Sequence, residues 1–485
     1  MNITRVLLLP ILATLALLAG CASRPVNPPI TEVNRNSGYR FATRQLLDND
    51  KENLVVLAFS GGGTRAAAFS YGVLEELRRT QLVTRQGKRV RLLDEVDVIT
   101  GVSGGSFTAL SYGLYGERLF DDYERRFLKR DVQGDLVSRF VNPENWSALW
   151  SSGWGRSEMA AQMYDEILFN GATFGDLDRS DGPLIVATAT DISTGSRFTF
   201  VQSEFDLICS ELDAVPLSRA AAASSAVPLV LSPVTFNNYG GTCNYQWPSW
   251  AKALLDPAKH ARPAGRSLQR LNELQNREDG ASRPFLHLVD GGISDNLGMR
   301  GVLEAMEELE AVRGLRKQTR LDDVRRMIVF VVNSLSVPKT NWDKSERPPN
   351  DVAILLKATG VPIDRNSYEA VELLKDIVAR WKTLRHVRES EGFAIGASGA
   401  LKEVIDVPNI EIYPIDVSFQ ALDDAAELEY LNDLPTSFVL SGEAVDRLRA
   451  AAGRIIVNSP EFQRLVKDLG ATAVPTSAIS LPAAQ

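Results

Sequence analysis

Histidine, cysteine and an excess of positive charge are all scarce in this 485-residue sequence. The chain has three histidines and three cysteines, and its formal net charge is −8. The negative charge and the lack of a basic stripe argue against a nucleic-acid partner. Neither Cys209 nor Cys243 has a histidine or another cysteine at metal-ligand spacing, so we predict no zinc site. Hydrophobic residues make up 44% and charged residues 24% of the chain, which is typical of a globular protein.

The N-terminal residues carry the clearest signal for location. A short basic start ending in Arg5 precedes an almost wholly apolar run from Val6 to Leu18, the general form of a secretory signal peptide. Leu18-Ala19-Gly20-Cys21 resembles a bacterial lipobox, which implies that residues 1–20 are removed and that Cys21 becomes a lipidated first residue. A short transmembrane anchor is the alternative. It is disfavoured because the run is short for a span and ends in a cysteine.

The cellular compartment is indicated by the residue after Cys21 and by the two remaining cysteines. Ala22, in place of aspartate, resembles the sorting pattern of Gram-negative lipoproteins destined for the outer membrane. We therefore predict a protein of the bacterial cell envelope, lipid-anchored in the outer membrane and facing the periplasm. In that oxidising compartment Cys209 and Cys243 can pair as a disulfide, and two buried free thiols are the alternative.

Apolar runs alternate with glycine-rich turns and helix-forming stretches, which predicts an α/β fold. We expect a central, mostly parallel sheet flanked by helices, followed by a helical C-terminal extension. The length suits about two to three domains, or one large α/β domain with insertions. The predicted organisation is a signal peptide (1–20), a flexible tether (21–50), a main domain (51–335) with insertions at 130–175 and 237–283, a mostly helical extension (336–470) with an edge strand near 410–417, and a disordered tail (471–485).

A glycine-rich turn follows the first buried strand. The apolar run Leu54–Phe59 suits a central strand, and Ser60-Gly61-Gly62-Gly63-Thr64-Arg65 separates it from a predicted helix. Without Cβ atoms, several backbone N–H groups can approach one ligand atom, so the turn can hold a phosphate or an oxyanion. No Gly-Lys-Ser/Thr follows, which excludes a P-loop, and Ala66 replaces the third glycine of a dinucleotide fingerprint. A plain glycine-rich turn is the alternative.

The stretch Gly101-Val102-Ser103-Gly104-Gly105 follows a second predicted strand and continues into helix-forming residues. Strand, tight turn and helix form the context of a nucleophile elbow, in which a strained turn exposes the serine hydroxyl. The start of the helix after Ser103 also offers free N–H groups to an anion. Because Gly-x-Ser-x-Gly alone is weak evidence, a turn without chemistry is the alternative.

A nucleophilic serine needs a base, and no histidine is placed to serve as one. His260 lies in a loop region, His287 in the middle of a strand and His386 in a charged helix. A hydrolase of the common α/β type carries its histidine after a late strand instead.

An aspartate takes the place of the missing histidine. Phe285–Val289 is a predicted strand that ends in Asp290-Gly291-Gly292, a carboxylate held on a tight turn. A partly desolvated aspartate within hydrogen-bond reach of a serine can accept its proton, so we predict Asp290 as the base. A helix-capping aspartate is the alternative.

The insertion at 130–175 concentrates large apolar side chains among polar residues. One interpretation is an apolar lip or lid that receives acyl chains or dips into a bilayer interface. The other is an insertion with a small core of its own. The side chains concerned are Phe140, Trp146, Trp150, Trp154, Met159, Met163, Tyr164 and Phe169.

Four motifs in this order resemble the patatin-like phospholipase family: Gly61–Arg65, Gly101–Gly105, Ala223–Pro228 and Asp290–Gly292. The resemblance covers roughly residues 54 to 335. It implies an α/β catalytic domain with a Ser–Asp dyad that hydrolyses acyl esters of lipids. By position it implies Ser103 as nucleophile and Asp290 as base, an oxyanion hole of Gly61, Gly62, Gly63, Arg65 and the N–H of Gly104, and motif glycines Gly101, Gly105, Gly291 and Gly292.

Two positions depart from the family pattern. Ser60 stands where the family often has aspartate, and Ala66 stands where it often has glycine. These departures and the long insertions affect the prediction of the substrate more than the prediction of the reaction.

The expected activity is that of a lipid acyl hydrolase of the phospholipase A, lysophospholipase or lipase type, working through an acyl-enzyme without metal or cofactor. Its expected partners are membrane lipids or lipid-derived acyl esters. The sequence leaves two alternatives open: a non-catalytic envelope lipoprotein that binds lipid or a partner, and a thioesterase or serine protease on the same dyad.

Overall fold

The computed structural model describes residues 23–44, 51–83, 89–149, 154–248, 251–252, 265–311, 321, 323–337, 342–390, 407–470 and 472–473. The predicted signal peptide, the lipidation residue Cys21, Trp150, His260 and almost all of the predicted C-terminal tail lie outside these residues.

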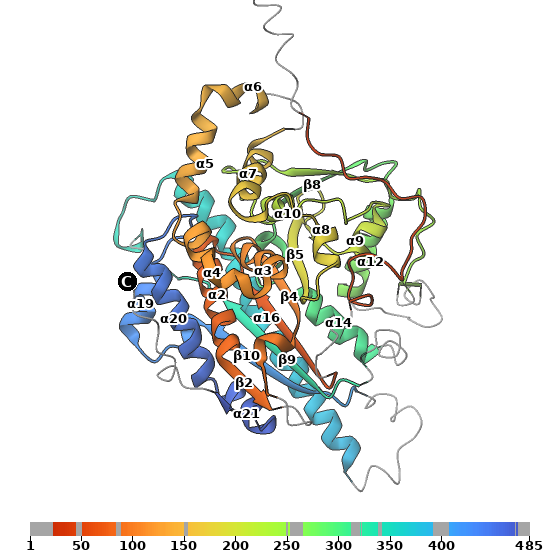
Figure 1. The fold of residues 1–485 in the computed structure, drawn as a ribbon, viewed down its shortest axis with the longest axis vertical. Helices are drawn as coiled ribbons and strands as arrows, with labels where there is room; N and C mark the ends of the chain where they lie inside the picture. Colours follow the sequence, from red (N-terminus) through yellow and green to blue (C-terminus); the bar gives the residue numbers. More distant parts are fainter. Residues whose placement is uncertain are drawn as a thin grey trace, which may run out of the picture.

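One eight-stranded sheet forms the centre of the molecule, with helices on both faces (Figure 1). The first five strands in spatial order run parallel, which confirms the predicted mostly parallel α/β sheet. In spatial order the strands are β10 (Glu411–Ser418), β9 (Arg326–Asn333), β1 (Asn53–Phe59), β4 (Val96–Val102), β5 (Leu184–Asp191), β8 (Phe285–Asp290) and β7 (Val234–Asn237), with β6 (Ser196–Thr199) paired to β5 off this path.

The central strand β1 is buried on both faces because its apolar residues are continuous. Alternate side chains of β1 enter two cores. Val55, Leu57 and Phe59 join the core that includes residues of α2 (Gly63–Arg79), α3 (Gly104–Tyr115) and α20 (Gly442–Asn458). Leu54, Val56 and Ala58 join the core that includes residues of α14 (Arg300–Ala311) and α16 (Asp351–Glu389). The result is an α/β/α sandwich.

The end of β5 explains how an antiparallel strand reaches the site. β4 pairs with β5 only as far as Val102, which lies beside Thr188. β5 continues to Asp191, and β8 pairs antiparallel with this extension alone, with Asp290 beside Ala189. The last residues of β4 and β8 therefore meet, although the two strands run in opposite directions.

The predicted C-terminal extension belongs to the sandwich and is not an appendage. β10 adds a parallel edge strand beside β9, and α20 packs on α2. Pro414 lies within β10, where an edge position tolerates a residue without an N–H. Residues after 335 thus complete the sheet and add helices to both of its faces, α20 to one and α16 to the other.

The remaining elements surround this framework. None of the described helices combines the length and apolar character needed for a membrane span. A small second sheet consists of β2 (Thr80–Val83), β3 (Arg89–Arg91) and β11 (Thr472–Ala473). The other helices are α4 (Leu119–Tyr123), α5 (Val132–Val141), α6 (Trp146–Leu149), α7 (Arg156–Tyr164), α8 (Phe174–Asp178), α9 (Gln202–Leu207), α10 (Leu217–Ser224), α12 (Gly265–Glu278), α13 (Gly292–Asp295), α19 (Ala425–Asn432) and α21 (Pro460–Asp468).

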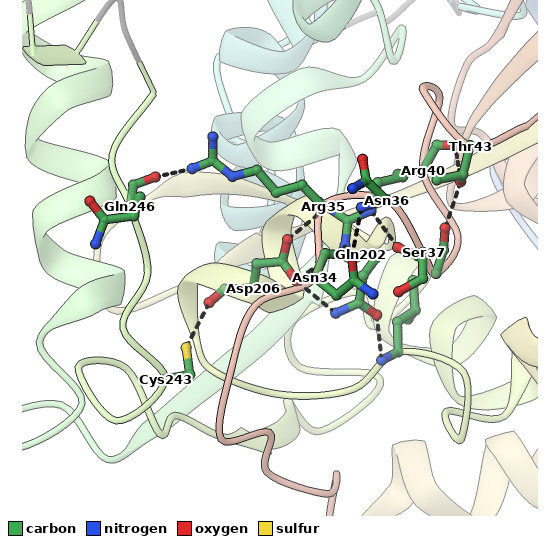
Figure 2. A network of polar contacts seen from close by, with 12 residues as sticks. Asn34, Arg35, Asn36, Ser37, Arg40, Thr43, Gln202, Asp206, Cys243 and Gln246 are labelled. Atoms are coloured by element: carbon green, nitrogen blue, oxygen red, sulfur yellow. Dashed lines mark hydrogen bonds and ion pairs between the residues drawn. The ribbon is translucent and has the colours of Figure 1, made fainter.

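Residues 23–44 are packed against the domain, which corrects the predicted flexible tether. Tyr39 is fully buried, and its hydroxyl accepts a hydrogen bond from the backbone N–H of Ile185 at 2.6 Å. The buried Arg40 guanidinium pairs with Asp206 at 2.8 Å, within the polar network of Figure 2. The composition of this segment is polar, but a few side chains fix it in place.

A disulfide between Cys209 and Cys243 lies beside this network. The two Cα atoms are 5.5 Å apart, and the Sγ of Cys243 is 3.5 Å from the carbonyl oxygen of Asp206. The sequence left both the paired and the free state open, and the structure contains the paired state.

The two halves of the insertion at 130–175 differ in exposure. Met159, Met163, Tyr164 and Phe169 are buried, and the last three belong to the main core of the domain and not to a separate small core of the insertion. By contrast, Trp146 on α6 is 47% exposed. In the first half, Val137 and Val141 are exposed as well, whereas Val132 and Leu136 are buried.

Candidate active site

Ser103 occupies a strained turn between β4 and α3. Its backbone angles are φ 47° and ψ −118°, a region that a residue with a Cβ atom rarely adopts. Such a conformation costs on the order of 1–3 kcal/mol and persists only where the surrounding structure enforces it. The turn lifts the side chain clear of both flanking elements, as a nucleophile elbow requires.

Asp290 meets the serine at the end of β8. The Ser103 hydroxyl donates to Oδ2 of Asp290 at 2.8 Å, and the Gly292 N–H donates to Oδ1 at 2.8 Å. Burial raises the pKa of Asp290 to about 6, although both hydrogen bonds act to lower it. A carboxylate with this pKa is ionised at neutral pH and is still a stronger proton acceptor than an ordinary aspartate.

The N-termini of two helices converge on Ser103. α3 begins at Gly104, directly after the serine, and α2 begins at Gly63. The two starts are in close contact, since a Cβ atom on Gly104 would lie 1.9 Å from the Gly63 carbonyl oxygen. The first N–H groups of a helix have no partner within it and carry partial positive charge. The N–H groups of Gly62, Gly63 and Gly104 are thus the donors that this arrangement offers to an anion.

Gly61 has a different place from the one predicted. Its N–H donates to the backbone oxygen of Asn296 at 2.9 Å, so it is not free for an oxyanion. A Cβ atom on Gly61 would lie 2.6 Å from Oδ1 of Asn296 and 3.3 Å from Cβ of Ser103. Gly61 therefore contributes close approach between the glycine turn and the serine, and not a donor.

Arg65 also departs from its predicted place in the oxyanion hole. Its guanidinium donates to the backbone oxygens of Ser334 and Leu434 at 2.8 and 2.7 Å and to Oγ1 of Thr436 at 3.1 Å. Burial lowers the pKa of this side chain to about 10, and the nearby Asp364 opposes the shift. Each of its three nitrogens donates a hydrogen bond to residues 334–436, so Arg65 ties the start of α2 to the C-terminal part of the chain.

Residues 434–438 contact the glycine-rich turn between β1 and α2. We call these residues the C-terminal clasp. The backbone oxygen of Ser437 accepts the Thr64 N–H at 2.8 Å. A Cβ atom on Gly63 would lie 2.3 Å from that same oxygen. Phe438 contacts Phe107 of α3 with ring centroids 5.7 Å apart. The clasp thus contacts both helix starts that face the serine.

A protein-family model matches this chain. The model of the patatin-like phospholipases matches residues 57–303, slightly more than half of the chain. The chain belongs to the patatin-like phospholipase family. The matched segment contains Ser103 and Asp290, while the C-terminal clasp lies beyond it.

Solved structures of human GIVD cytosolic phospholipase A2 are similar to this chain at low identity. One has a TM-score of 0.41 at 13% identity and covers 89% of this chain and 64% of its own. Another, in complex with methyl gamma-linolenyl fluorophosphonate, has a TM-score of 0.39 at 13% identity and covers 89% and 61%. The chain thus spans less than two thirds of the length of these proteins. A comparison with curated protein sequences finds no significant match.

Within the family pattern, the departure at Ser60 has a physical explanation. The Ser60 and Ser334 hydroxyls lie 3.1 Å apart, and the Ser334 N–H donates to Oγ of Ser60 at 3.0 Å. Ser334 follows β9, so a pair of hydroxyls links the two neighbouring strand ends where an aspartate is usual. Ala66 lies inside α2 with its N–H bonded to the oxygen of Gly62, so its methyl group leaves the helix start intact.

Two residues of the site were not assigned a role from the sequence. Oγ of Ser224 accepts the Ser103 N–H at 2.8 Å and donates to the oxygen of Thr188 at 2.6 Å, which fixes the backbone of the elbow. Asn296 contacts Gly61 through its backbone oxygen and binds Ser367 of α16 at 3.3 Å. Ser224 lies in the Ala223–Pro228 motif that carries the family resemblance.

The remaining glycines and histidines singled out from the sequence either flank the Ser103–Asp290 dyad or lie away from it. Gly101 and Gly105 flank the elbow, and Gly291 contacts the oxygen of Thr188 so closely that a Cβ atom would lie 2.2 Å away. The ring of His287 bonds Thr235 on the neighbouring strand at 3.0 Å, and His386 is exposed on α16. Within the described ranges, no cluster of three or more histidine, cysteine or acidic side chains could hold a metal ion.

Proposed function

We propose that this protein is a lipid acyl hydrolase in which Ser103 is the nucleophile and Asp290 is the general base. The observation that carries the proposal is the 2.8 Å hydrogen bond from Ser103 to a buried carboxylate, next to two converging helix N-termini. Membership of the patatin-like phospholipase family supports ester hydrolysis as the reaction.

The first step is acylation of the serine. As Oγ of Ser103 attacks the ester carbonyl carbon, its proton passes to Oδ2 of Asp290 and the carbonyl oxygen becomes an oxyanion. The N–H groups of Gly62, Gly63 and Gly104 stabilise this charge, each by about 3–4 kcal/mol where such donors have been removed in other enzymes. Collapse of the intermediate breaks the ester bond, and the alcohol leaves with the proton from Asp290.

The second step is hydrolysis of the acyl-enzyme. Asp290 accepts a proton from water as the water oxygen attacks the acyl carbon, and the same donors stabilise the second oxyanion. The bond to Oγ breaks, Ser103 recovers its proton through Asp290, and a carboxylic acid leaves. The raised pKa of Asp290 suits it to carry a proton in both directions near neutral pH.

We further propose that the substrate is an acyl ester of a membrane lipid and that the mature chain is anchored in the outer membrane through Cys21. The lipobox-like sequence and the apolar residues near the site support both parts of this proposal. An enzyme held at a bilayer by its own acyl chains meets lipid esters at high local concentration.

A fluorophosphonate probe tests the dyad directly. The wild-type protein should be labelled covalently and hydrolyse a phospholipid, and Ser103→Ala should lose both. The matched control is Ser111→Ala, which removes a buried hydroxyl from the same helix without touching the dyad. Labelling that survives in Ser103→Ala would exclude Ser103 as the nucleophile, and a wild-type protein without labelling would support a binding protein instead.

Substrate class needs a separate comparison. Phospholipid, lysophospholipid, triacylglycerol, acyl thioester and peptide substrates should be offered to the same preparation. Lipid oxygen esters should be cleaved at least about tenfold faster than thioesters or peptides, because the chain belongs to a family of phospholipases, which act on lipid oxygen esters. The reverse order would favour a thioesterase or a protease on the same dyad.

A further inference from the structure

An apolar surface adjoins both the active site and the N-terminal end of the described chain. We call it the apolar rim and define it by Val26, Val137, Val141, Trp146, Leu229 and Val230. Their exposed fractions run from 47% for Trp146 to 63% for Val141 and Leu229. Soluble domains rarely gather large apolar side chains at solvent without a partner.

The rim begins at the active site. Asp290 donates its backbone N–H to the oxygen of Ala226 at 3.0 Å, and the exposed Leu229 and Val230 follow a few residues later. The same loop then binds the start of α7, where Oγ of Ser232 accepts the Ser157 N–H at 3.2 Å. The exposed apolar side chains of this loop therefore lie on a segment whose start is hydrogen-bonded to the backbone of Asp290.

The rim continues to the N-terminal segment. Trp154, just before α7, and Pro25 line a cavity of about 420 Å³ whose other lining residues are mostly polar and include Glu158, Asp165, Glu166 and Arg219. Arg24 donates to the backbone oxygen of Thr235 at 3.1 Å, and the buried Arg219 bonds that same oxygen. Val26, two residues after Arg24, is 60% exposed. The segment is thus fixed beside the site and keeps one apolar side chain outward.

Helices α5 and α6 extend the rim at the same end of the molecule. Val137 and Val141 lie one turn apart on α5, and Trp146 begins α6. Figure 1 shows α6 and the first described residues of the N-terminal segment together at one end of the long axis, while α21 lies toward the other end.

The position of Cys21 limits how far a bilayer anchored there can lie from the packed N-terminal segment. Only Ala22 separates Ser23, the first described residue, from Cys21. Two residues span at most about 7 Å, so acyl groups on Cys21 place the bilayer surface within that reach of the packed segment. A flexible tether would allow any orientation, but residues 23–44 are packed and do not.

We propose that the apolar rim docks on the lipid bilayer in which the Cys21 acyl chains are inserted, so that the dyad faces the membrane surface. This inference rests on the anchor and the lipid substrate proposed above. Tryptophan and aliphatic side chains enter the headgroup–acyl boundary favourably, and two attachments hold a protein at a membrane far longer than one.

Depth-dependent quenching tests docking without any need for catalysis. The full lipidated chain carrying Ser103→Ala is placed in vesicles of phosphatidylethanolamine and phosphatidylglycerol, with and without brominated acyl chains. Bromine should quench tryptophan emission, and Trp146→Phe should remove much of that quenching. The double change Val137→Asp with Val141→Asp should lower it at least about twofold by keeping α5 out of the lipid.

Val457→Asp is the matched control, because Val457 is 39% exposed near the end of α20, next to α21 and away from the rim. Equal quenching in all variants would overturn the proposal. So would a double variant that loses a dimer while quenching persists, since the rim would then cover a second copy. A purified membrane form without acyl groups on Cys21, judged by intact mass, would also overturn it.

Hydrolysis separates this inference from the proposed function. With Ser103 present, the rim double variant should cleave vesicle phospholipid at least about tenfold more slowly and a soluble short-chain ester at nearly the wild-type rate. Absence of hydrolysis of either substrate by the wild-type chain would contradict the proposed function alone, because the quenching result does not depend on it.

Discussion

The two regions that meet at the glycine turn contribute very different things to the site. Residues 57–303 match the family model and contain the nucleophile, the base and the helix starts that face them. Residues 334–438 contain no recognisable motif, yet Ser334, Leu434, Thr436 and Ser437 hold the start of α2 by its backbone and by Arg65. The reacting residues can be recognised from sequence motifs. The contacts that hold the start of α2 in position cannot.

This comparison predicts that changes in the matched region abolish the reaction, whereas changes at the clasp weaken it in proportion to how far the helix starts move. Changes in either region should affect the same kinetic parameter, kcat, and differ in the size of the effect. A loss of chemistry or of donor geometry lowers kcat, while substrate binding at the rim is left in place.

The largest effect is expected from Asp290→Asn. The amide has nearly the same shape but cannot take up the Ser103 proton, so hydrolysis of a soluble ester should fall by roughly 10³- to 10⁴-fold. Circular dichroism should show an unchanged fold. A variant that retains more than about a tenth of the wild-type rate would contradict the role of Asp290 as base.

The next largest effect is expected from Gly63→Ala, at the contact between the two regions. A methyl group there would lie 2.3 Å from the Ser437 oxygen, and the residue has φ +61°. The start of α2 must therefore shift, and kcat should fall by about 10²- to 10³-fold as the oxyanion donors move. Gly360→Ala is the control, because a Cβ atom at Gly360 has no neighbour within 4 Å. Equal rates for the two variants would mean that the clasp contact does not matter.

Arg65→Lys tests the clasp through its side chain. Lysine keeps the charge but cannot reach the oxygens of Ser334 and Leu434 and the Thr436 hydroxyl together. We expect kcat for a soluble ester to fall about 10- to 100-fold with KM nearly unchanged, since displacements of about 1 Å have such effects. Arg454→Lys, at an exposed ion pair with Glu427, should change neither parameter. A rise in KM alone would instead indicate that Arg65 contacts the substrate.

The pH–rate profile should report the environment of Asp290. Burial raises its pKa to about 6, and only the ionised form accepts a proton. The value of kcat/KM should therefore fall about tenfold per pH unit below that pKa and level off above it. A profile that stays flat down to pH of about 4, the ordinary aspartate value, would show that the carboxylate is not desolvated.

The smallest effect concerns stability and has the opposite sign from the effect on activity. Because the folded pKa of Asp290 lies above its unfolded value, its contribution to stability is complete below about pH 4 and is lost as the pH rises through about 6. Asp290→Asn should therefore raise the free energy of unfolding at pH 8 by about 2–3 kcal/mol and have little effect at pH 4. Denaturant titrations at the two pH values check this, and a variant less stable at pH 8 would contradict it.

Much of the fold and of the dyad could be predicted because each element has a local signature. The buried run of β1, the elbow around Ser103 and the turn at Asp290 are patterns of neighbouring residues. The clasp could not be predicted in this way. Arg65 is separated from Leu434 by 369 residues, and its partners are mostly backbone oxygens that any sequence supplies.

Two further differences have the same origin. The antiparallel pairing of β8 depends on the residues by which β5 extends beyond β4. No residue within β8 indicates this pairing. Residues 23–44 have a polar composition typical of a tether, but Tyr39 and Arg40 bind partners far along the chain. The composition shows correctly that residues 23–44 are polar. It does not show the few long-range contacts that fix this segment to the domain.

The clasp also has a consequence for the order in which the protein is made. A chain synthesised and exported from its N-terminus contains Ser103 and Asp290 well before Leu434 appears, and until then the start of α2 lacks the contacts that set its position. Under the export that we propose, the chain crosses a bilayer built of the esters that we propose it cleaves. We expect a chain without residues 434–438 to be inactive, because the start of α2 then lacks the contacts that position it.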